Sequence, residues 1–566
     1  MKRIIVLLLL SAVVGLRGNA QDITALQKQI SYKLASMKPA NLAIGNIEVK
    51  SILVDDKKKT VCVEMGDSFS YIPLRKNNVA EYYKTVKALL PENYSSYKLS
   101  IKSSGNPIET LQLYSDKGKT FTTKSDRPLV TRLSSPYVPE KGLSGRHIAL
   151  WQSHGFYFEA KLNRWEWQRA RIFQTVEDLY TQSYVMPFLV PMLENAGACV
   201  LTPRERDINT HEVIVDNDRN SDSSVYEEFN GTAKNLWETG GTGFSHLREY
   251  YIDNQNPFME GTYRQIKTVK DGKKVNDSKI KWTPFIPESG EYAVYVSYKT
   301  VENSTDDAHY TVCHKGGKTD FLVNQTMGGG TWIYLGHFTF DKGKTGYVEL
   351  SNRSRKAGRV LTADAVKIGG GYGNIARKVG NRISDNVKSA EAVAKEEESE
   401  APSIDYEYEL SGYPRFTEAA RYWLQWAGFP EKVYSLSKGV NDYTDDYKSR
   451  GEWVNYLAGG SSVLPDSAGL NIPVDMAFAF HSDAGTTPND SIIGTLGIFC
   501  TGINGAEPKF ANKINRYVSR DLVDLIMTNI VNDIRRLHEP EWTRRGMWNQ
   551  SYFEARVPQV PTMLLE

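Results

Sequence analysis

The feature that most constrains the fold is an interruption of one structural pattern by another. A strand–helix–strand pattern begins near residue 145, stops near residue 214 and resumes after residue 404. Between these segments, residues 289–298, 330–340 and 346–350 alternate polar and apolar side chains, as half-buried antiparallel strands do. Such strands with glycine-rich turns predict an all-β sandwich. We therefore expect an open α/β domain in two segments, residues 145–214 and 405–566, with a β-sandwich inserted over residues 215–372.

The other segments complete a multidomain α/β organisation. Residues 21–140 contain helix-like and strand-like runs and predict a small α+β domain, whose role the residues do not indicate. Residues 373–404 include the charged run 395–400 and predict a solvated linker. A chain of 566 residues is long enough for such a set of domains.

The N-terminal residues predict an exported protein. Lys2 and Arg3 precede an apolar stretch that is short for a membrane span, and Gly18 and Ala20 supply the small residues of a cleavage site after Ala20. The alternative is an uncleaved membrane anchor, but no second apolar run of spanning length follows. We expect residues 1–20 to be a signal peptide and the protein to be periplasmic or secreted, with no transmembrane segment after cleavage.

Charge and cysteine content exclude some functions. The net charge of +2 comes from 69 basic and 67 acidic residues, so the sequence gives no electrostatic reason to expect nucleic-acid binding. The four cysteines are scattered without metal-binding spacing, and we expect them mainly in the core.

Polar side chains follow three of the expected strands of the α/β domain. His154, His481 and Glu566 each come after a short apolar strand, and Glu177 lies near the start of a helix. In open α/β sheets the carboxyl ends of the strands line the ligand-binding crevice. Two imidazoles and one carboxylate commonly bind catalytic zinc, and a second carboxylate can act as a base. Each residue alone has a structural alternative, a hydrogen-bonded core histidine or a glutamate placed for the helix dipole.

The same residues lie in motifs that resemble those of the zinc-dependent N-acetylmuramoyl-L-alanine amidases. The motifs are Ser153-His154-Gly155, Glu177-Asp178-Leu179, the run 197–207, the run from Arg450 to Asn455, the strand into His481, and the proline-led strand into Glu566. The resemblance implies that His154, Glu177 and His481 bind one Zn²⁺ per chain, that Glu566 is the general base or acid, and that Arg450 and Asn455 contribute to substrate binding. It also implies cleavage of the amide between N-acetylmuramic acid and L-alanine in peptidoglycan or muropeptides.

The insert resembles the golvesin C-terminal-like domain, on the runs 330–336 and 360–368. This resemblance implies glycan or cell-wall binding, with a spacer role as the alternative. Two alternatives also remain for the whole chain. One is a non-catalytic cell-wall or polysaccharide-binding protein that retains an amidase-like fold, and the other is a zinc hydrolase acting on a different amide, such as a peptidase.

Overall fold

The computed structural model describes residues 20–113, 125–135, 137, 142–172, 174–219, 223–272, 275–379, 407–482, 489, 491–502 and 507–566. Residues 1–19 of the expected signal peptide and 380–404 of the expected linker lie outside the described residues. Two compact units are present. One contains residues 1–120, 492–497 and 520–549, and the other contains residues 121–491, 498–519 and 550–566.

The first unit is built around a four-stranded mixed sheet in the order β1-β2-β3-β4. Strands β2 and β3 are parallel, and β1 and β4 pair antiparallel at the two edges. Arg520, which is fully buried, donates hydrogen bonds to the carbonyl oxygens of Ser70 and Leu111. This residue belongs to the expected second α/β segment, yet it packs with the N-terminal domain, because its guanidinium satisfies two carbonyls there. The bounds are α1 Ala20–Ser36, β1 Val49–Asp55, β2 Thr60–Met65, α2 Asp67–Ser70, α3 Lys76–Leu89, β3 Lys98–Ser103 and β4 Asn106–Pro107.

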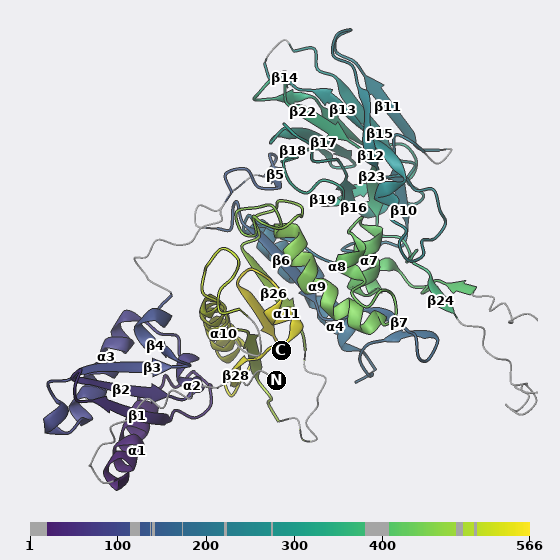
Figure 1. The fold of residues 1–566 in the computed structure, drawn as a ribbon. Coiled ribbons are helices and arrows are strands. Elements are labelled where there is room, and N and C mark those ends of the chain that lie inside the picture. The colour runs from purple at the N-terminus through teal and green to yellow at the C-terminus, as the bar shows by residue number, and fades with distance from the viewer. Residues whose placement is uncertain are drawn as a thin grey trace, which may run out of the picture. The chain divides into compact units, whose positions relative to one another are not determined.

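The second unit contains four parallel strands in the order β29-β26-β6-β9, and β6 and β26 lie side by side in Figure 1. Their bounds are β6 His147–Gln152, β9 Cys199–Leu201, β26 Met476–Phe480 and β29 Thr562–Leu565. Phe480 is in register with both Gln152 and Leu565. Because the three strands end level with one another, the residues that follow them leave the sheet at one edge.

The helix that begins at Glu177 is broken, as prolines inside a helix lead one to expect. It consists of α4 Glu177–Tyr184, a π-helical turn over Val185–Leu189 that contains Pro187, and α5 Val190–Asn195 with Pro191. Its apolar side packs on β6 and β9, where Ile148, Leu150, Val185, Val190, Ala198 and Val200 form a buried cluster. The remaining helices of this part are α7 Ala420–Trp426, α8 Glu431–Tyr434, α9 Asp442–Ala458 and α11 Phe553–Arg556.

The predicted sheet-rich insert is confirmed. Strand β16 (Gly290–Val296) pairs antiparallel with β19 (Ile333–Phe340) and β23 (Val366–Gly369). A second sheet has the order β11-β15-β20-β17-β18-β5, and its Trp282 and Tyr310 are buried. The strand bounds are β10 Glu212–Val215, β11 Val225–Phe229, β12 Glu238–Gly243, β13 Gly261–Lys267, β14 Val269–Lys270, β15 Lys279–Thr283, β17 Ala308–His314, β18 Gly317–Val323, β20 Tyr347–Ser351, β21 Arg353–Ser354 and β22 Val360–Ala363.

Strand β5 (Val130–Arg132) joins the insert from outside it. It comes before the α/β segment in the chain, yet Val130 pairs with Val323 of β18. The expected N-terminal domain extends to residue 140, whereas the structure uses residues 130–132 to cover the edge of the sandwich. An uncovered edge strand leaves backbone N–H and C=O groups unpaired, and pairing with residues 130–132 satisfies them.

The other described elements lie between and after these parts. They are β7 Phe156–Glu159, β8 Arg164–Trp167, β24 Arg377–Val379, β25 Glu407–Glu409, β27 Thr495–Phe499, α10 Tyr517–Leu537 and β28 Arg544–Asn549.

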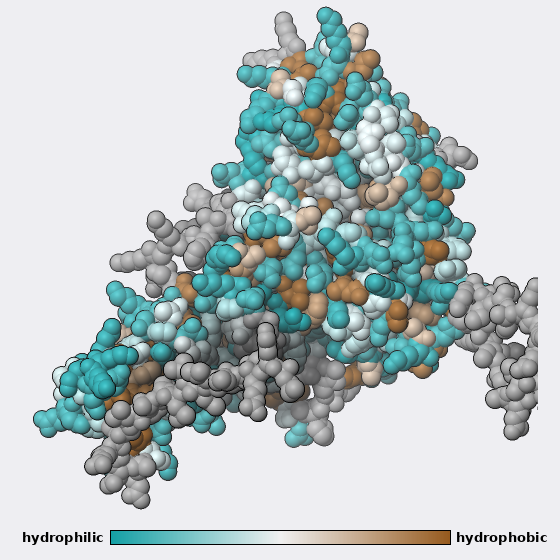
Figure 2. All heavy atoms as spheres, in the orientation of Figure 1, coloured by the Kyte–Doolittle hydropathy of each residue, from teal (hydrophilic) through white to brown (hydrophobic). Residues whose placement is uncertain are grey.

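In the described part of the chain, no helix combines the length and the apolar character needed to cross a membrane. On the face shown in Figure 2, apolar residues form scattered patches among hydrophilic ones. The four cysteines are free, and of these only Cys500 is fully buried.

Candidate metal centre

Three of the predicted site residues meet at the carboxyl edge of the parallel strands. His154, Glu177 and His481 each place one ligand atom within 4.8 Å of the other two, and all three side chains are buried. His481 follows β26 directly, and its backbone N–H donates to the carbonyl oxygen of Leu565 across 2.8 Å. Glu177 opens α4. Strand register and the start of one helix therefore bring together residues that are far apart in the chain.

A buried arginine holds the loop that carries His154. The Arg204 guanidinium donates to the carbonyl oxygens of Gln152 and Glu418 at 3.0 and 2.9 Å, and also to that of His154. Burial lowers the pKa of Arg204 to about 10, so the group stays charged at neutral pH. Gly155 lies so close to the backbone of residues 418 and 419 that a Cβ atom would come within 2.6 Å of it. The loop after β6 is therefore tightly packed.

Both imidazoles turn Nδ1 toward Glu177. His154 Nδ1 lies 3.7 Å from Glu177 Oε2, and His481 Nδ1 lies 3.3 Å from Glu177 Oε1. The two rings are 4.9 Å apart and inclined at 70°. Among the described residues, Nδ1 of His154 has no hydrogen-bond partner although it is buried. An orphaned imidazole nitrogen beside a second imidazole and a carboxylate is a donor set that fits zinc and leaves a coordination position open.

The opposite nitrogens of the two rings have different neighbours. Arg169 Nη2 lies 3.0 Å from Nε2 of His154, and Arg169 Nε donates to Glu177 Oε2 across 3.1 Å. Nε2 of His481 lies 3.4 Å from Oε2 of Glu554. An arginine thus adjoins one imidazole, and a second carboxylate adjoins the other.

Charge interactions shift the pKa values in this cluster in opposite directions. Burial, reinforced by His481, Arg450 and Arg169, holds the pKa of His154 well below its usual value. Burial also lowers the pKa of His481, but Glu554 and Glu177 outweigh it and raise that pKa to about 9. Without a bound metal, these shifts favour the neutral form of His154 and the protonated form of His481.

Glu554 is a buried carboxylate of this cluster that was not among the predicted site residues. It lies in the short helix α11, and its Oε1 accepts hydrogen bonds from Trp151 Nε1 at 2.5 Å and from Arg450 Nη1 at 2.8 Å. Burial alone would raise its pKa, but Arg450 and His481 lower it to about 2. No strand-end position or short motif marks this residue in the sequence.

The remaining predicted site residues lie around this cluster. Glu566 follows β29 at the same edge and is half-buried, but it is not one of the three residues whose ligand atoms converge. Arg450 pairs with Asp446 and Glu554. Asn455 donates to the carbonyl oxygen of Val557 across 3.1 Å and accepts from the Gln559 backbone N–H across 2.8 Å. These bonds connect Arg450 and Asn455 to the segment that leads into β29.

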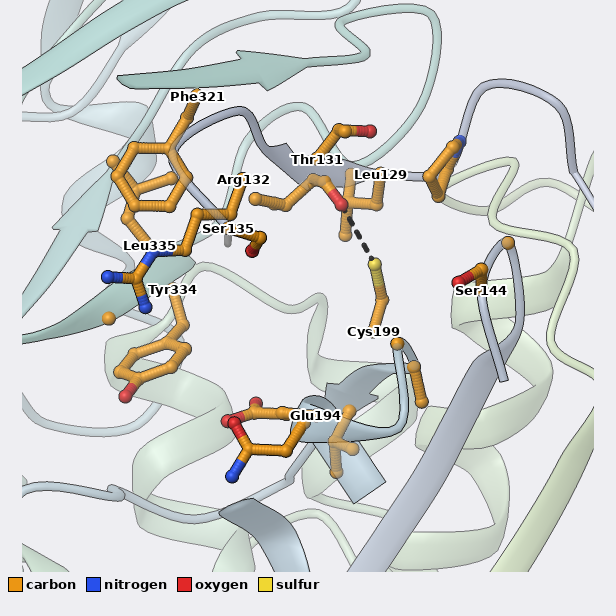
Figure 3. Close-up of a pocket in the computed structure, with 18 of the residues that line it drawn as sticks. Leu129, Thr131, Arg132, Ser135, Ser144, Glu194, Cys199, Phe321, Tyr334 and Leu335 are labelled. Carbon is orange, nitrogen blue, oxygen red and sulfur yellow. Dashed lines mark hydrogen bonds between the residues drawn. The ribbon is translucent and has the colours of Figure 1, made fainter. Parts of the chain in front are cut away.

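A cavity of about 780 Å³ lies elsewhere in the same unit, between the sandwich and the amino-terminal ends of β6 and β9 (Figure 3). In Figure 3, Arg132, Tyr334 and Phe321 line one side, and Cys199 and Glu194 line the other. The metal centre is at the opposite, carboxyl-terminal ends of these strands. A volume of this size is within the usual range of ligand pockets.

Comparison with known proteins identifies the insert. The family profile of the golvesin C-terminal domain matches residues 254–370. These residues are a golvesin C-terminal domain. The predicted resemblance of the insert to this domain is therefore confirmed.

Part of the chain is also similar to a xanthan lyase of Bacillus sp. (strain GL1), with 29% identity over 156 residues. The match covers 27% of this chain and 14% of the relative, so the chain spans only a small part of that protein. The solved Paenibacillus xanthan lyase is 28% identical over 29% of this chain and 13% of that chain, with a TM-score of 0.22. A family 35 carbohydrate-binding module of Clostridium thermocellum is 17% identical over 28% of this chain and 98% of its own, with a TM-score of 0.17.

These comparisons correct the predicted enzyme class. The similar curated protein is a xanthan lyase, and the matched domain is golvesin-like; neither is an amidase. The prediction that the chain is an N-acetylmuramoyl-L-alanine amidase is therefore wrong. The motifs behind this prediction contain residues that do meet in space. However, residues at strand ends meet in many α/β proteins that catalyse different reactions or none.

Proposed function

We propose that this chain is an exported protein that binds polysaccharide without cleaving it. The observation that carries the proposal is the golvesin C-terminal domain over residues 254–370, in a chain similar over part of its length to a xanthan lyase. Two polymers are to be tested as ligands: peptidoglycan, and xanthan, on which the similar lyase acts. The positively charged and small residues around the apolar run 4–14 support export.

The cavity beside the golvesin domain has suitable chemistry for a glycan. Its walls carry hydroxyl, carboxylate and guanidinium groups, from Ser135, Ser144, Glu194 and Arg132, together with aromatic side chains such as Tyr137. Sugars present hydroxyl groups that pair with such polar side chains, and apolar ring faces that pack on aromatic ones. Arg132 and Tyr137 are exposed, so both are accessible to a polymer.

We also propose that His154, Glu177 and His481 bind one Zn²⁺ per chain. The buried, unpaired Nδ1 of His154 supports this, because a buried polar atom without a partner is costly unless a ligand satisfies it. When bound, zinc would supply a Lewis acid that can accept an oxygen ligand at its open position. The protein's own residues hold the donor atoms together and shield them from water.

Binding measurements test the polysaccharide proposal. We expect the purified protein to sediment with peptidoglycan sacculi. In a second experiment, we expect xanthan in a native gel to slow its migration. The double variant Arg132→Ala/Tyr137→Ala should weaken binding at least about tenfold, the effect of losing a major contact. The control is Lys344→Ala, which removes an exposed charge outside the cavity. Failure of the unaltered protein to bind either polymer would contradict the proposal.

Metal analysis tests the zinc proposal separately. The unaltered protein should contain one zinc per chain after dialysis, and His154→Ala should contain none. Equal zinc content in both proteins would rule out these residues as the ligands. Muropeptide digestion should release no product, and a product that disappears on chelation would contradict the non-catalytic proposal.

A further inference from the structure

The two nitrogens of the His481 ring face two different carboxylates. Nδ1 lies 3.3 Å from Glu177 Oε1, and Nε2 lies 3.4 Å from Glu554 Oε2. The second contact is at ion-pair distance and is not a hydrogen bond, because Nε2 of His481 has no hydrogen-bond partner among the described residues. The two nitrogens flank Cε1 and point in different directions in the ring plane, so Glu177 and Glu554 approach His481 from different sides. Only Glu177 shares the converging cluster with His154. Glu554 is therefore placed outside the candidate ligand set but adjacent to one of its members.

The orientation of Glu554 is determined by its other oxygen. Oε1 accepts one hydrogen bond from the indole N–H of Trp151 and one from the guanidinium of Arg450. Trp151 belongs to β6 and Arg450 belongs to α9, so two separate elements hold the carboxylate. Arg450 is itself anchored to Asp446 one helical turn earlier. Oε2 is left pointing at His481.

We propose that Glu554 is a positioning residue that selects Nδ1 of His481 as the metal-binding nitrogen. This proposal rests on the proposed zinc site. A neutral imidazole carries one proton, and only the nitrogen without it can bind a metal. An ionised carboxylate can only accept, so in the metal-bound state Glu554 would complete a hydrogen bond with Nε2–H across the present 3.4 Å contact and keep the proton there. The Nδ1 lone pair is then left for the metal, on the side of Glu177. Such outer carboxylates orient histidine ligands in metalloproteins.

Substitution of Glu554 by glutamine should reverse this selection. Trp151 and Arg450 are both donors, so they would retain the amide oxygen at the Oε1 position. The amide NH₂ would then take the Oε2 position and donate to Nε2 of His481. The ring proton would move to Nδ1, where it blocks metal binding. Glutamine has the same shape as glutamate, so the change acts on the tautomer with little change in packing.

Zinc affinity, measured by competition with a fluorescent chelator, is the first test. We expect Glu554→Gln to weaken zinc binding about 10–100-fold, as loss of an outer-shell partner does. The matched control is Glu452→Gln, a half-buried carboxylate on the same helix as Arg450 that should leave the affinity unchanged. Unchanged affinity in Glu554→Gln would overturn the proposal. If the unaltered protein binds no zinc at all, the zinc site itself fails and this inference fails with it.

The second test needs no variant at Glu554. In protein labelled with ¹⁵N-histidine and loaded with zinc, the His481 signal should show the proton on Nε2, with assignment from its loss in His481→Gln. A proton on Nδ1 would overturn the proposal even if the Glu554 variant fails to fold. If the role of Glu554 is merely structural, Glu554→Gln would lower the melting temperature without altering the tautomer of His481.

A further variant, Trp151→Phe, removes one of the two donors to Oε1 of Glu554. It should weaken zinc binding less than Glu554→Gln does.

Discussion

The guanidinium of Arg169 donates to Nε2 of His154 across 3.0 Å. It also donates to Glu177 Oε2, so one cation contacts two of the three candidate ligands. Because an arginine is always a donor, Nε2 must accept, and the proton of a neutral His154 is then on Nδ1. A metal bound at Nε2 of His154 would displace Arg169, and a metal bound at Nδ1 would move the ring proton to Nε2, where it would face the guanidinium N–H. Metal binding at either nitrogen therefore requires Arg169 to move. Arg169 therefore stabilises the site in its metal-free arrangement.

Removing Arg169 should strengthen metal binding. In Arg169→Ala, zinc no longer competes with a neighbouring positive charge for Glu177, and we expect the affinity to rise several-fold to about tenfold. The side chain is one-third exposed, so solvent screening limits the effect. Chelator competition measures the change, with Arg164→Ala as a control at an exposed ion pair. Weaker binding in Arg169→Ala would show that Arg169 supports the metal-bound state instead.

Stability without metal should fall as pH rises from about 6.5 to about 9. The pKa of His481 is raised from 6.5 to about 9 in the folded chain. A histidine whose pKa is higher in the folded state than in the unfolded state stabilises the folded state fully at a pH below its unfolded-state pKa. This stabilisation is lost as pH rises through its folded-state pKa. The contribution is on the order of 3 kcal/mol. The difference in free energy of unfolding between the unaltered protein and His481→Gln, measured with chelator present, should shrink over this range. A constant difference would contradict the predicted pairing with Glu554 and Glu177.

Zinc should raise the melting temperature of the second unit. A ligand that binds only the folded state at 100 times its Kd stabilises it by about 2.7 kcal/mol. Calorimetry with and without chelator measures this, and His154→Ala and His481→Ala should both lose the effect. His211→Ala, at a partly exposed histidine that pairs with Glu288, should keep it. Equal stabilisation of the site variants would place the zinc elsewhere.

Gly155→Ala should destabilise the fold and disturb the metal centre. A Cβ atom there would lie 2.6 Å from the Ala419 nitrogen and from the carbonyl oxygen of Glu418. Both are backbone atoms, so relief requires a shift of the chain next to His154, at a cost of about 1–3 kcal/mol. Urea unfolding measures the loss, and Gly272→Ala, where only a side-chain methyl lies within van der Waals contact, is the control. No change in Gly155→Ala would show that the backbone there yields easily.

Much of the candidate site could be predicted from local sequence. His154 and His481 follow apolar strands, and strand ends of an open α/β sheet meet at one edge. The break in the helix after Glu177 also followed from Pro187 and Pro191. The amidase assignment was wrong because the same motifs report how residues are arranged and do not report which reaction, if any, they perform.

The sequence by itself determined which kinds of secondary structure form, because apolar periodicity depends only on neighbouring residues. It predicted the alternating strands of the golvesin domain and the short apolar strands that precede the two histidines. Only the tertiary structure decided how the metal centre is supported. Glu554 becomes part of it because Trp151 and Arg450, about 400 and 100 residues away, converge on one of its oxygens. Contacts over such separations depend on strand register and helix packing, which no local pattern of residues records.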